Sequence, residues 1–406
     1  MELKGNTLLA GGIARAIGTI AVDRIEESRG RALPRTPEQI ADPDVINALV
    51  EAYGPSDMPA LPRVRAARLP GVHFESSNCT NFLVELEYEG KPEAGEPAPQ
   101  TLYVKLPCAE LATRTFANAV GFWEVEATFC ERVASKVPVR VPRVYASARR
   151  GARFVLLLEN LHELEGTKLF DNRDMAAGTT VERARMCLRA FAELHSAFWG
   201  WPAERRNALV PDRLHTYIAP GARERTRALN AASVGPAHKA APDVFTERHA
   251  GLFREAIRKW DALVDVWYSD PLTLVHGDSH LANLFEYPGS DGPRMGMIDF
   301  QGMHWCQGIR DIQYFLINSM DPELLAENEE QLVDFYVDEL AARGVGLDRD
   351  DARQGYRAYS FQTLIVAVTS IGLGALTERS ATVRTVLERS VAAIDRLGFG
   401  TWLAEL

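Results

Sequence analysis

One short stretch, LVHGDSHLANLFEY at 274–287, places two histidines, an aspartate and an asparagine between apolar runs. Polar groups in such a position cost free energy unless they have a use. Asp278 and Asn283 are separated by four residues, and Asp299 follows the apolar segment MGMI. Phosphoryl transfer needs such a set, because one carboxylate orients the attacking hydroxyl while an asparagine and a second carboxylate hold Mg²⁺. The order matches the kinase pattern, whereas a purely structural reading must explain three polar residues at once.

The upstream half of the chain offers the other parts of a kinase site. A kinase needs a strand lysine for the α- and β-phosphates and a helix glutamate that holds this lysine. Lys105 lies in the strand-like segment TLYVKLP. In the helix predicted around FWEVEATFCERVA, Glu126 falls within the apolar stripe and Glu124 points nearly opposite. Because a buried carboxylate needs a partner, we expect Glu126 to pair with Lys105 and Glu124 to be solvated.

The elements that must position these residues divide the chain into three parts. The 406 residues exceed the roughly 250–300 over which a single core grows, so two lobes are expected. Residues 1–65 are predicted to form a helical extension that packs on the N-lobe. Residues 66–161 contain alternating segments such as NFLVELEY and predict a small β-rich N-lobe. Residues 162–406 predict a larger, mainly helical C-lobe with the catalytic loop and the acceptor site.

Local signals within the C-lobe predict three further features. Thr179 and Glu182 are spaced as a capping box before a helix. Residues 220–245 are rich in Ala and Gly and poorly periodic, which predicts a variable insertion. The apolar segment at 361–376 is shorter than the ~18 residues of a membrane span and predicts a buried core helix.

Composition and charge argue against several classes of protein. The net charge is −10, from 45 Lys and Arg against 55 Asp and Glu, which disfavours nucleic-acid binding. The five cysteines are scattered and show no close pair, so we expect no disulfide framework and a cytoplasmic location. The N-terminal stretch MELKGNTLLAGGIARAIGTI predicts an amphipathic helix rather than a signal peptide. Stable membrane insertion is therefore not expected.

A family resemblance rests on these motifs together. Lys105, Glu126, LLLENL, HGDSHLAN and IDFQ resemble the aminoglycoside phosphotransferase and choline kinase superfamily. The segments VKLP, EATF, VPRVY and ELHSAFWG, with the Asp-Phe-Gln ending, most closely resemble its ecdysteroid kinase-like branch and the bacterial relatives of that branch. The resemblance covers residues 40–400. It implies an α+β, two-lobed protein-kinase-like fold and phosphorylation of a small-molecule hydroxyl by ATP and Mg²⁺.

The resemblance also implies roles for individual residues. Asp278 would be the catalytic base, and Asn283 and Asp299 the Mg²⁺ ligands. Asp311, in GIRDIQYF, would brace the catalytic loop, and His276 would anchor that loop by hydrogen bonds. Two further histidines, His195 and His304, are predicted to be packing or substrate-side residues, and His280 to support the loop as His276 does.

The nucleotide contacts are predicted at two places in the N-lobe. The phosphate loop falls near HFESSNCTN, which lacks a glycine-rich pattern, so Ser76, Ser77 and Asn78 are expected to supply donors instead. The apolar run FVLLLENL is predicted to be the interlobe hinge, whose backbone at Glu159 and Leu161 hydrogen-bonds adenine.

Several alternatives remain open for the substrate and the activity. The favoured acceptor is an apolar polycyclic or macrocyclic alcohol, and an aminoglycoside or choline-type substrate is the alternative. No activation segment ends in Ala-Pro-Glu, which disfavours a protein substrate. The first rival is a metal-dependent phosphoesterase built on the H-x-D-x-H of His276, Asp278 and His280. The second is a catalytically silent nucleotide-binding kinase fold.

Overall fold

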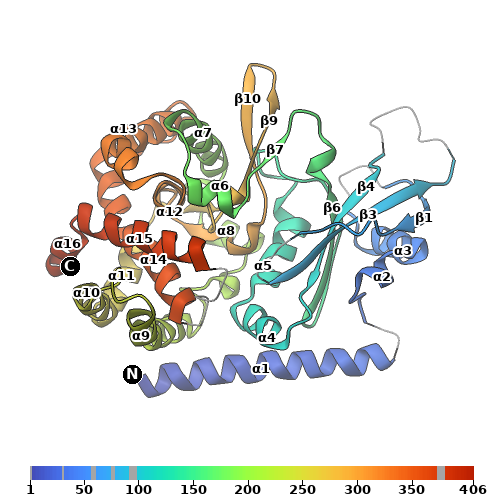
Figure 1. The fold of residues 1–406 in the computed structure, drawn as a ribbon, viewed down its shortest axis with the longest axis horizontal. Helices are drawn as coiled ribbons and strands as arrows, with labels where there is room; N and C mark the ends of the chain where they lie inside the picture. The colour runs from blue at the N-terminus through green and yellow to red at the C-terminus, as the bar shows by residue number, and fades with distance from the viewer. Residues whose placement is uncertain (1, 30–31, 56–60, 75–77, 91–97, 373–379) are drawn as a thin grey trace. The chain divides into compact units, whose positions relative to one another are not determined.

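The computed structural model describes residues 2–29, 32–55, 61–74, 78–90, 98–372 and 380–406. Contacts divide the chain into two compact units, each of which is described by itself (Figure 1). We call residues 10–137 and 141–167 the sheet unit, and residues 1–9, 138–140 and 168–406 the helical unit.

An antiparallel sheet forms the centre of the sheet unit. Its strands follow the order β1-β3-β4-β6-β5, and β2 pairs with β3. Strand β4, which carries Lys105, is therefore an inner strand paired on both sides. The strands are β1 (Val64–Arg68), β2 (His73–Phe74), β3 (Cys79–Tyr88), β4 (Thr101–Pro107), β5 (Val144–Arg150) and β6 (Arg153–Glu159).

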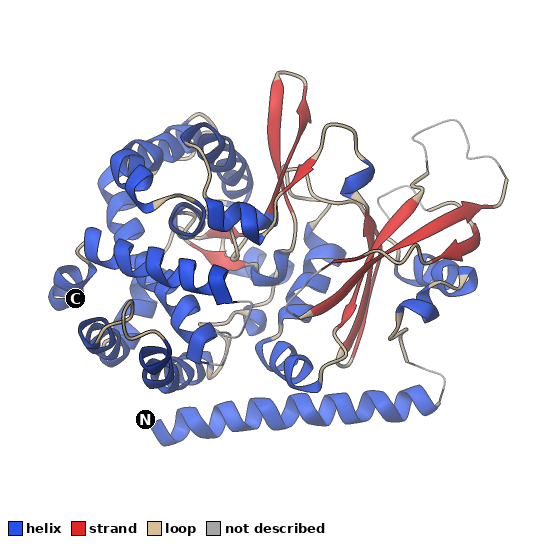
Figure 2. Cartoon of the chain, viewed as in Figure 1, coloured by secondary structure: helices blue, strands red, loops and turns tan. Residues whose placement is uncertain are grey.

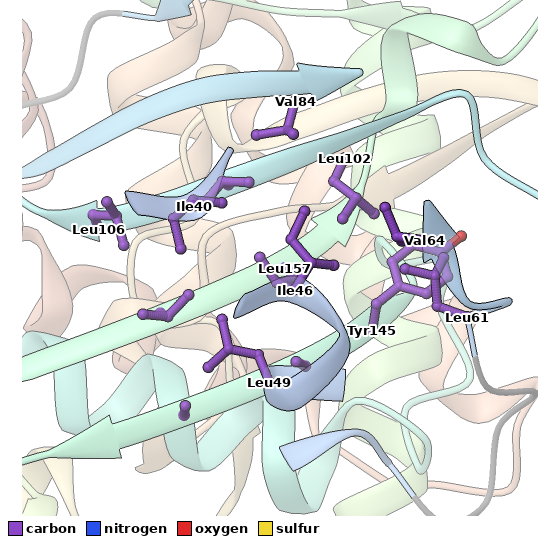
Figure 3. Close-up of a cluster of buried hydrophobic side chains, with 14 of the residues drawn as sticks. Ile40, Ile46, Leu49, Leu61, Val64, Val84, Leu102, Leu106, Tyr145 and Leu157 are labelled. Atoms are coloured by element: carbon purple, nitrogen blue, oxygen red, sulfur yellow. The ribbon is translucent and has the colours of Figure 1, made fainter. Parts of the chain in front are cut away.

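The alternating pattern of the strands directs one set of side chains into an apolar core. Val84, Leu102 and Leu157 lie on this face and are buried. Two helices that precede the sheet in sequence contribute to the same cluster, α2 (Pro37–Ile40) through Ile40 and α3 (Pro43–Tyr53) through Ile46 and Leu49 (Figure 3). The N-terminal segment therefore belongs to the core that holds the Lys105 strand in place.

Further helices of the sheet unit carry Glu126 and dock the N-terminus. The chain forms α4 (Leu111–Val120), α5 (Phe122–Thr128) and the π-helical turn η1 (Phe129–Val133), and α5 packs against β5 and β6. Helix α1 (Glu2–Ser28) is attached through Asp23, which accepts a hydrogen bond from the Ala152 backbone N–H at 2.9 Å.

The helical unit contains most of the helices, together with two small antiparallel sheets (Figure 2). One sheet joins β8 to β11, and the other has the order β10-β9-β7. All residues of α12 (Ile309–Ser319) are buried, which makes this helix the centre of the unit. The strands and short helical turns are β7 (Lys168–Leu169), β8 (Thr273–Val275), η4 (Leu281–Asn283), β9 (Leu284–Gly289), β10 (Gly292–Met297), η5 (Phe300–Gly302) and β11 (His304–Cys306).

Helix α12 is surrounded by helices from both flanks of the sequence. It contacts α7, α13, α14 and α15. The remaining helices are α6 (Asn172–Ala177), α7 (Val181–Phe198), α8 (Ala203–Leu209), α9 (Ala222–Ala240), α10 (Glu247–Arg258), α11 (Trp260–Trp267), α13 (Pro322–Ala341), α14 (Arg349–Gly372), α15 (Ser380–Arg396) and α16 (Phe399–Glu405).

The α+β fold class predicted from the sequence is confirmed, and two local expectations need correction. The cap of α7 is Thr180, whose side chain accepts from the Arg183 N–H, whereas Thr179 is buried. Part of the predicted variable insertion is the helix α9, which packs along α14 and buries Val234 and Ala237. The apolar segment at 361–376 is buried helix as far as Gly372, and its last residues lie outside the described ones.

The contact-based division falls after Thr167 and assigns residues 1–9 and 138–140 to the helical unit. Among the described residues, none of the helices combines the length and apolarity needed to cross a membrane.

Candidate active site

The loop that follows β8 carries Asp278 and is held by a backbone-to-backbone contact. Gly277 has a φ of +84°, and a Cβ built on it would lie 1.8 Å from the Gly302 carbonyl oxygen. Only glycine permits both the left-handed backbone and this approach. The loop is therefore fixed against the segment that follows Asp299.

Asp311, at the start of α12, anchors the same loop from inside the unit. Its carboxylate accepts hydrogen bonds from the backbone N–H groups of His276 at 2.6 Å and Gly277 at 3.1 Å. Its own carbonyl accepts from the Ser279 hydroxyl at 2.9 Å. Asp311 is fully buried, so these contacts satisfy a carboxylate that water does not reach. The structure thus places Asp311 where the sequence predicted a brace.

Two cationic or proton-donating side chains complete the surroundings of Asp311. His195 donates from Nε2 to one carboxylate oxygen at 3.2 Å, and Arg310 donates to the other at 3.3 Å. Burial by itself raises the pKa of Asp311, but the His195 hydrogen bond and these neighbouring charges outweigh it and hold the pKa well below its usual range. The predicted packing residue His195 is therefore part of the brace.

His276 has both ring nitrogens occupied by the backbone. Its Nε2 donates to the Ile298 carbonyl at 2.8 Å, and its Nδ1 accepts from the Asp278 N–H at 3.2 Å. Burial lowers the pKa of His276 and favours this neutral form. Neither nitrogen is left to bind a metal, so the H-x-D-x-H arrangement of the rival phosphoesterase is absent. The described residues also contain no group of three or more His, Cys, Asp or Glu that could hold a metal ion.

Asp278 is partly exposed, with 26% of its side chain accessible. The Tyr314 hydroxyl donates to Oδ1 at 3.2 Å, and His280 Nε2 lies 3.6 Å from the same oxygen. Burial raises the pKa of Asp278, but the charge and hydrogen bond of His280, together with other neighbouring cations, hold it well below its usual range. The carboxylate is therefore ionised at neutral pH and can accept a proton or orient a hydroxyl.

Asn283 and Asp299 offer hard oxygen ligands of the kind that Mg²⁺ prefers. The Asn283 amide nitrogen donates to the Asp278 carbonyl at 2.8 Å, which leaves Oδ1 as the acceptor end of the side chain. Asp299 is the one non-glycine with a positive φ among the residues that the structure describes, at +63°. Strained backbone of this kind occurs at functional sites. The donor set fits a Mg²⁺ ion bound by a few carboxylate and amide oxygens plus water.

In the sheet unit, Lys105 forms an ion pair with Glu126, as predicted from the apolar stripe of the helix. The exposed fractions of the two side chains are 7% and 4%. Glu124 instead pairs with Arg149 at 3.0 Å, toward the outside of the helix. Removing one partner of a buried pair leaves an uncompensated charge, so the ion pair with Glu126 holds Lys105 in position.

The structure describes only some of the other residues that were predicted to contact the nucleotide. Ser76 and Ser77 lie outside the described residues. Asn78 is buried, and its backbone carbonyl accepts from the Cys108 N–H at 3.3 Å. The Glu159 carboxylate accepts from the Arg143 N–H at 2.9 Å, and Leu161 begins the short helical turn η2 (Leu161–Glu163).

Sequence reasoning missed Arg310 and Tyr314, which link Asp311 to Asp278. The Arg310 guanidinium lies 4.8 Å from the centre of the Tyr314 ring, whose hydroxyl reaches Asp278. Tyr314 follows Asp311 by three residues, so one helical turn places both side chains toward the loop. That spacing was the available signal for Tyr314. Arg310 was harder to identify, because a charged residue beside an aspartate is usually solvated.

The braced loop carries an ionised aspartate and an asparagine and lies beside a strained aspartate, which are residue types that phosphoryl transfer requires. The family model for the ecdysteroid kinase-like family matches residues 80–344, more than half of the chain. The chain belongs to the ecdysteroid kinase-like family, and the predicted resemblance is confirmed.

Comparison with solved structures finds matches at low identity. A putative aminoglycoside phosphotransferase from Ralstonia eutropha is 14% identical, with 89% of this chain and 98% of that chain covered and a TM-score of 0.48. An ethanolamine kinase from Plasmodium vivax is 11% identical, with 80% and 81% covered and a TM-score of 0.49.

One curated protein matches a part of the chain. The imidazolonepropionase of Ruegeria pomeroyi is 31% identical over 164 residues, which are 39% of this chain. The chain spans 38% of the length of this relative. A match of this extent does not establish a shared family.

The close contact between Gly277 and Gly302 predicts how a substitution of Gly277 would affect the loop. We expect Gly277→Ala to expose the amides of residues 274–283 to hydrogen exchange, because its Cβ would displace the Gly302 backbone. Gly344→Ala is the matched control, since Gly344 has a φ of +80° but no atom within 4 Å of an added Cβ. Both variants carry about 1–2 kcal/mol of backbone strain, so only the clash distinguishes them. Equal protection of the loop in both would contradict the account.

Burial of His304 predicts how the stability of the protein depends on pH. His304 donates from Nδ1 to the Gly302 carbonyl at 2.8 Å, and burial lowers its pKa to about 4. The unfolded chain has an ordinary pKa near 6.5, so it takes up the proton first as the pH falls. The stability that neutral His304 contributes is therefore present above pH 6.5 and lost between pH 6.5 and 4.

We expect the free energy of unfolding to fall from pH 7 to pH 5 by about 2 kcal/mol more in the wild type than in His304→Asn. Asparagine can keep the hydrogen bond to Gly302 but does not titrate. Urea unfolding at the two pH values measures the difference. The same pH dependence in both proteins would show that His304 is not held neutral.

Proposed function

We propose that the chain transfers the γ-phosphoryl group of ATP to a hydroxyl of a small molecule in a Mg²⁺-dependent reaction. The observation that carries this proposal is the geometry around Asp278. A buried brace fixes its backbone, and Tyr314 and His280 orient its ionised carboxylate. A kinase aspartate requires this preorganisation, since catalysis of phosphoryl transfer is mainly positioning and electrostatics.

In the proposed reaction, the acceptor hydroxyl donates its hydrogen bond to the Asp278 carboxylate. The acceptor oxygen forms a bond to the γ-phosphorus as the bond between that phosphorus and the β-γ bridging oxygen breaks, and ADP leaves. The hydroxyl proton passes to Asp278. The low pKa of this carboxylate suits a loose transition state, in which the nucleophile needs orientation more than a strong base.

Asn283 and Asp299 are proposed to hold the metal through oxygen atoms. A Mg²⁺ ion held there would neutralise negative charge that develops on the phosphate groups. The Asn283 amide is oriented for this role because its nitrogen is used by the Asp278 carbonyl.

The sheet unit is proposed to bind the nucleotide. Lys105, held by Glu126, supplies a positive charge for the α- and β-phosphates. Asn78 and the hinge residues Glu159 and Leu161 are proposed as further nucleotide contacts. Among the described residues, none accepts a hydrogen bond from the Leu161 N–H, which is therefore available to adenine.

The acceptor is proposed to be an apolar polycyclic or macrocyclic alcohol, as membership of the ecdysteroid kinase-like family suggests. An aminoglycoside or a choline-type substrate is the alternative, and the net charge of −10 would attract such cations. A silent kinase fold is disfavoured because the base, the amide, the second carboxylate and the lysine pair are all retained. We propose that the protein acts in the cytoplasm.

Replacement of the proposed base tests the reaction. We expect Asp278→Asn to lower the rate of phosphate transfer by about 10²–10⁴-fold, because the amide cannot accept the hydroxyl proton. Transfer is measured with γ-³²P-labelled ATP and a panel of sterols, macrolides, aminoglycosides and choline. Binding of Mg–ATP should be retained.

Asp291→Asn is the matched control, since Asp291 lies exposed in the turn between β9 and β10. Full turnover in Asp278→Asn would contradict the assignment of the base. Hydrolysis of phosphoesters without ATP would favour the phosphoesterase instead.

A further inference from the structure

Three polar atoms in the helical unit are buried without a hydrogen bond of good geometry. They are His304 Nε2, Gln362 Nε2 and the Tyr268 hydroxyl. Each side chain belongs to a different element, namely β11, α14 and the end of α11. Unsatisfied buried polar atoms are rare in folded proteins and cost free energy. Because the three atoms lie on neighbouring side chains, one polar group from outside the chain, or an internal water, can complete them together.

His304 presents a hydrogen-bond acceptor. Because the Gly302 carbonyl can only accept, the Nδ1 atom that faces it at 2.8 Å must carry the proton. The neutral ring then has a lone pair on Nε2. Only 8% of His304 is exposed, so water at the surface does not satisfy this lone pair.

Gln362 presents a hydrogen-bond donor. Its Oε1 accepts from Arg310 Nε at 3.3 Å, which fixes the orientation of the amide. The Nε2 group is therefore directed away from Arg310, and its interaction with the Tyr268 hydroxyl falls short of good hydrogen-bond geometry. Tyr268 interacts with Gln362, and its ring centre lies 6.2 Å from that of His304, so the three side chains form one cluster.

A second histidine holds the ring of His304 in place without competing for its lone pair. His215 uses both of its nitrogens, because Nε2 donates to the Trp305 carbonyl at 2.9 Å and Nδ1 accepts from the Tyr217 N–H at 3.1 Å. The two imidazole rings pack edge to face, with centres 4.8 Å apart. His215 therefore packs against His304 in a fixed orientation and leaves the lone pair on His304 Nε2 unused.

The cluster is connected to Asp278 along two routes. His304 pairs in register with Val275 across β8 and β11, and it bonds the Gly302 carbonyl that contacts Gly277. On the other route, Gln362 bonds Arg310, which lies over the ring of Tyr314. The Tyr314 hydroxyl donates to Asp278. Both routes stay within the helical unit.

We propose that His304, Gln362 and Tyr268 form a polar subsite that binds a second hydroxyl of the acceptor, one that is not phosphorylated. This inference rests on the proposed function and deepens it. A hydroxyl is the group that both donates to His304 Nε2 and accepts from Gln362 Nε2. A carboxylate cannot donate to His304, and an ammonium cannot accept from Gln362. The buried Arg310 beside the cluster also repels a cation. The preferred acceptor is therefore uncharged and carries at least two hydroxyls.

Matched pairs of acceptors test this subsite. The probes are steroid and macrolide pairs in which the second member lacks one hydroxyl, and kcat/KM is measured by release of ADP and by mass of the product. We expect the wild type to favour the diol in at least one pair by about tenfold or more, since the analogue leaves polar atoms unpaired. In His304→Asn this ratio should fall at least about tenfold, because asparagine retains the bond to Gly302 and lacks the distal nitrogen. Gln362→Glu removes the donor and should reduce the ratio too.

His238→Asn is the matched control. His238 also bonds a backbone carbonyl through Nδ1, that of Phe245 at 2.7 Å, but its side chain is 31% exposed and lies on α9. This variant should keep the wild-type ratio.

The possible outcomes distinguish failure of the proposed subsite from failure of the proposed function. If pairs are phosphorylated without preference for the diol, or the ratio survives in His304→Asn, the subsite is wrong and the kinase assignment stands. If His304→Asn lowers only the Tm, the orphaned atoms are completed by internal water and the subsite is also wrong. If the folded wild type phosphorylates no alcohol, the proposed function fails and the subsite fails with it.

Discussion

The buried carboxylate of Asp311 is the constraint on which the rest of the helical unit depends. A charge at this depth is tolerated only if donors surround it. Those donors are the backbone of the Asp278 loop at His276 and Gly277, together with His195 and Arg310. The requirement to satisfy one anion therefore also fixes the backbone that carries Asp278. Helix α12 can supply this anion because it is buried along its whole length.

The same electrostatic logic appears at Lys105 in the sheet unit. There a buried cation is held by Glu126, and the strand that carries it is paired on both sides. The buried charge is negative in the helical unit, at Asp311, and positive in the sheet unit, at Lys105. Each places a charged side chain on rigid structure beside a partner of opposite charge. Because these groups are buried, loss of either partner would leave an unpaired charge in the interior and destabilise the fold.

Much of this arrangement could be predicted from the sequence, because the type and position of some residues allowed only one role. The position of Glu126 in an apolar stripe predicted its pairing with Lys105, and the family motif predicted the brace at Asp311. The sequence could not predict the tautomers of His276 and His304, because they depend on backbone carbonyls brought together by tertiary contacts. Helix α9 was missed for a related reason. Its Ala-rich sequence has weak periodicity, and packing along α14 stabilises it.

Thermal unfolding in the presence of Mg–ATP tests the proposed role of Asp299 in binding the nucleotide. Ligand at about 100 times its dissociation constant adds about 2.7 kcal/mol to the folded state, a rise of a few degrees for a chain of this length. The account predicts a Mg²⁺-dependent rise in Tm with ATP in the wild type and its loss in Asp299→Ala. The absence of a rise in the wild type, or an equal rise in the variant, would contradict it.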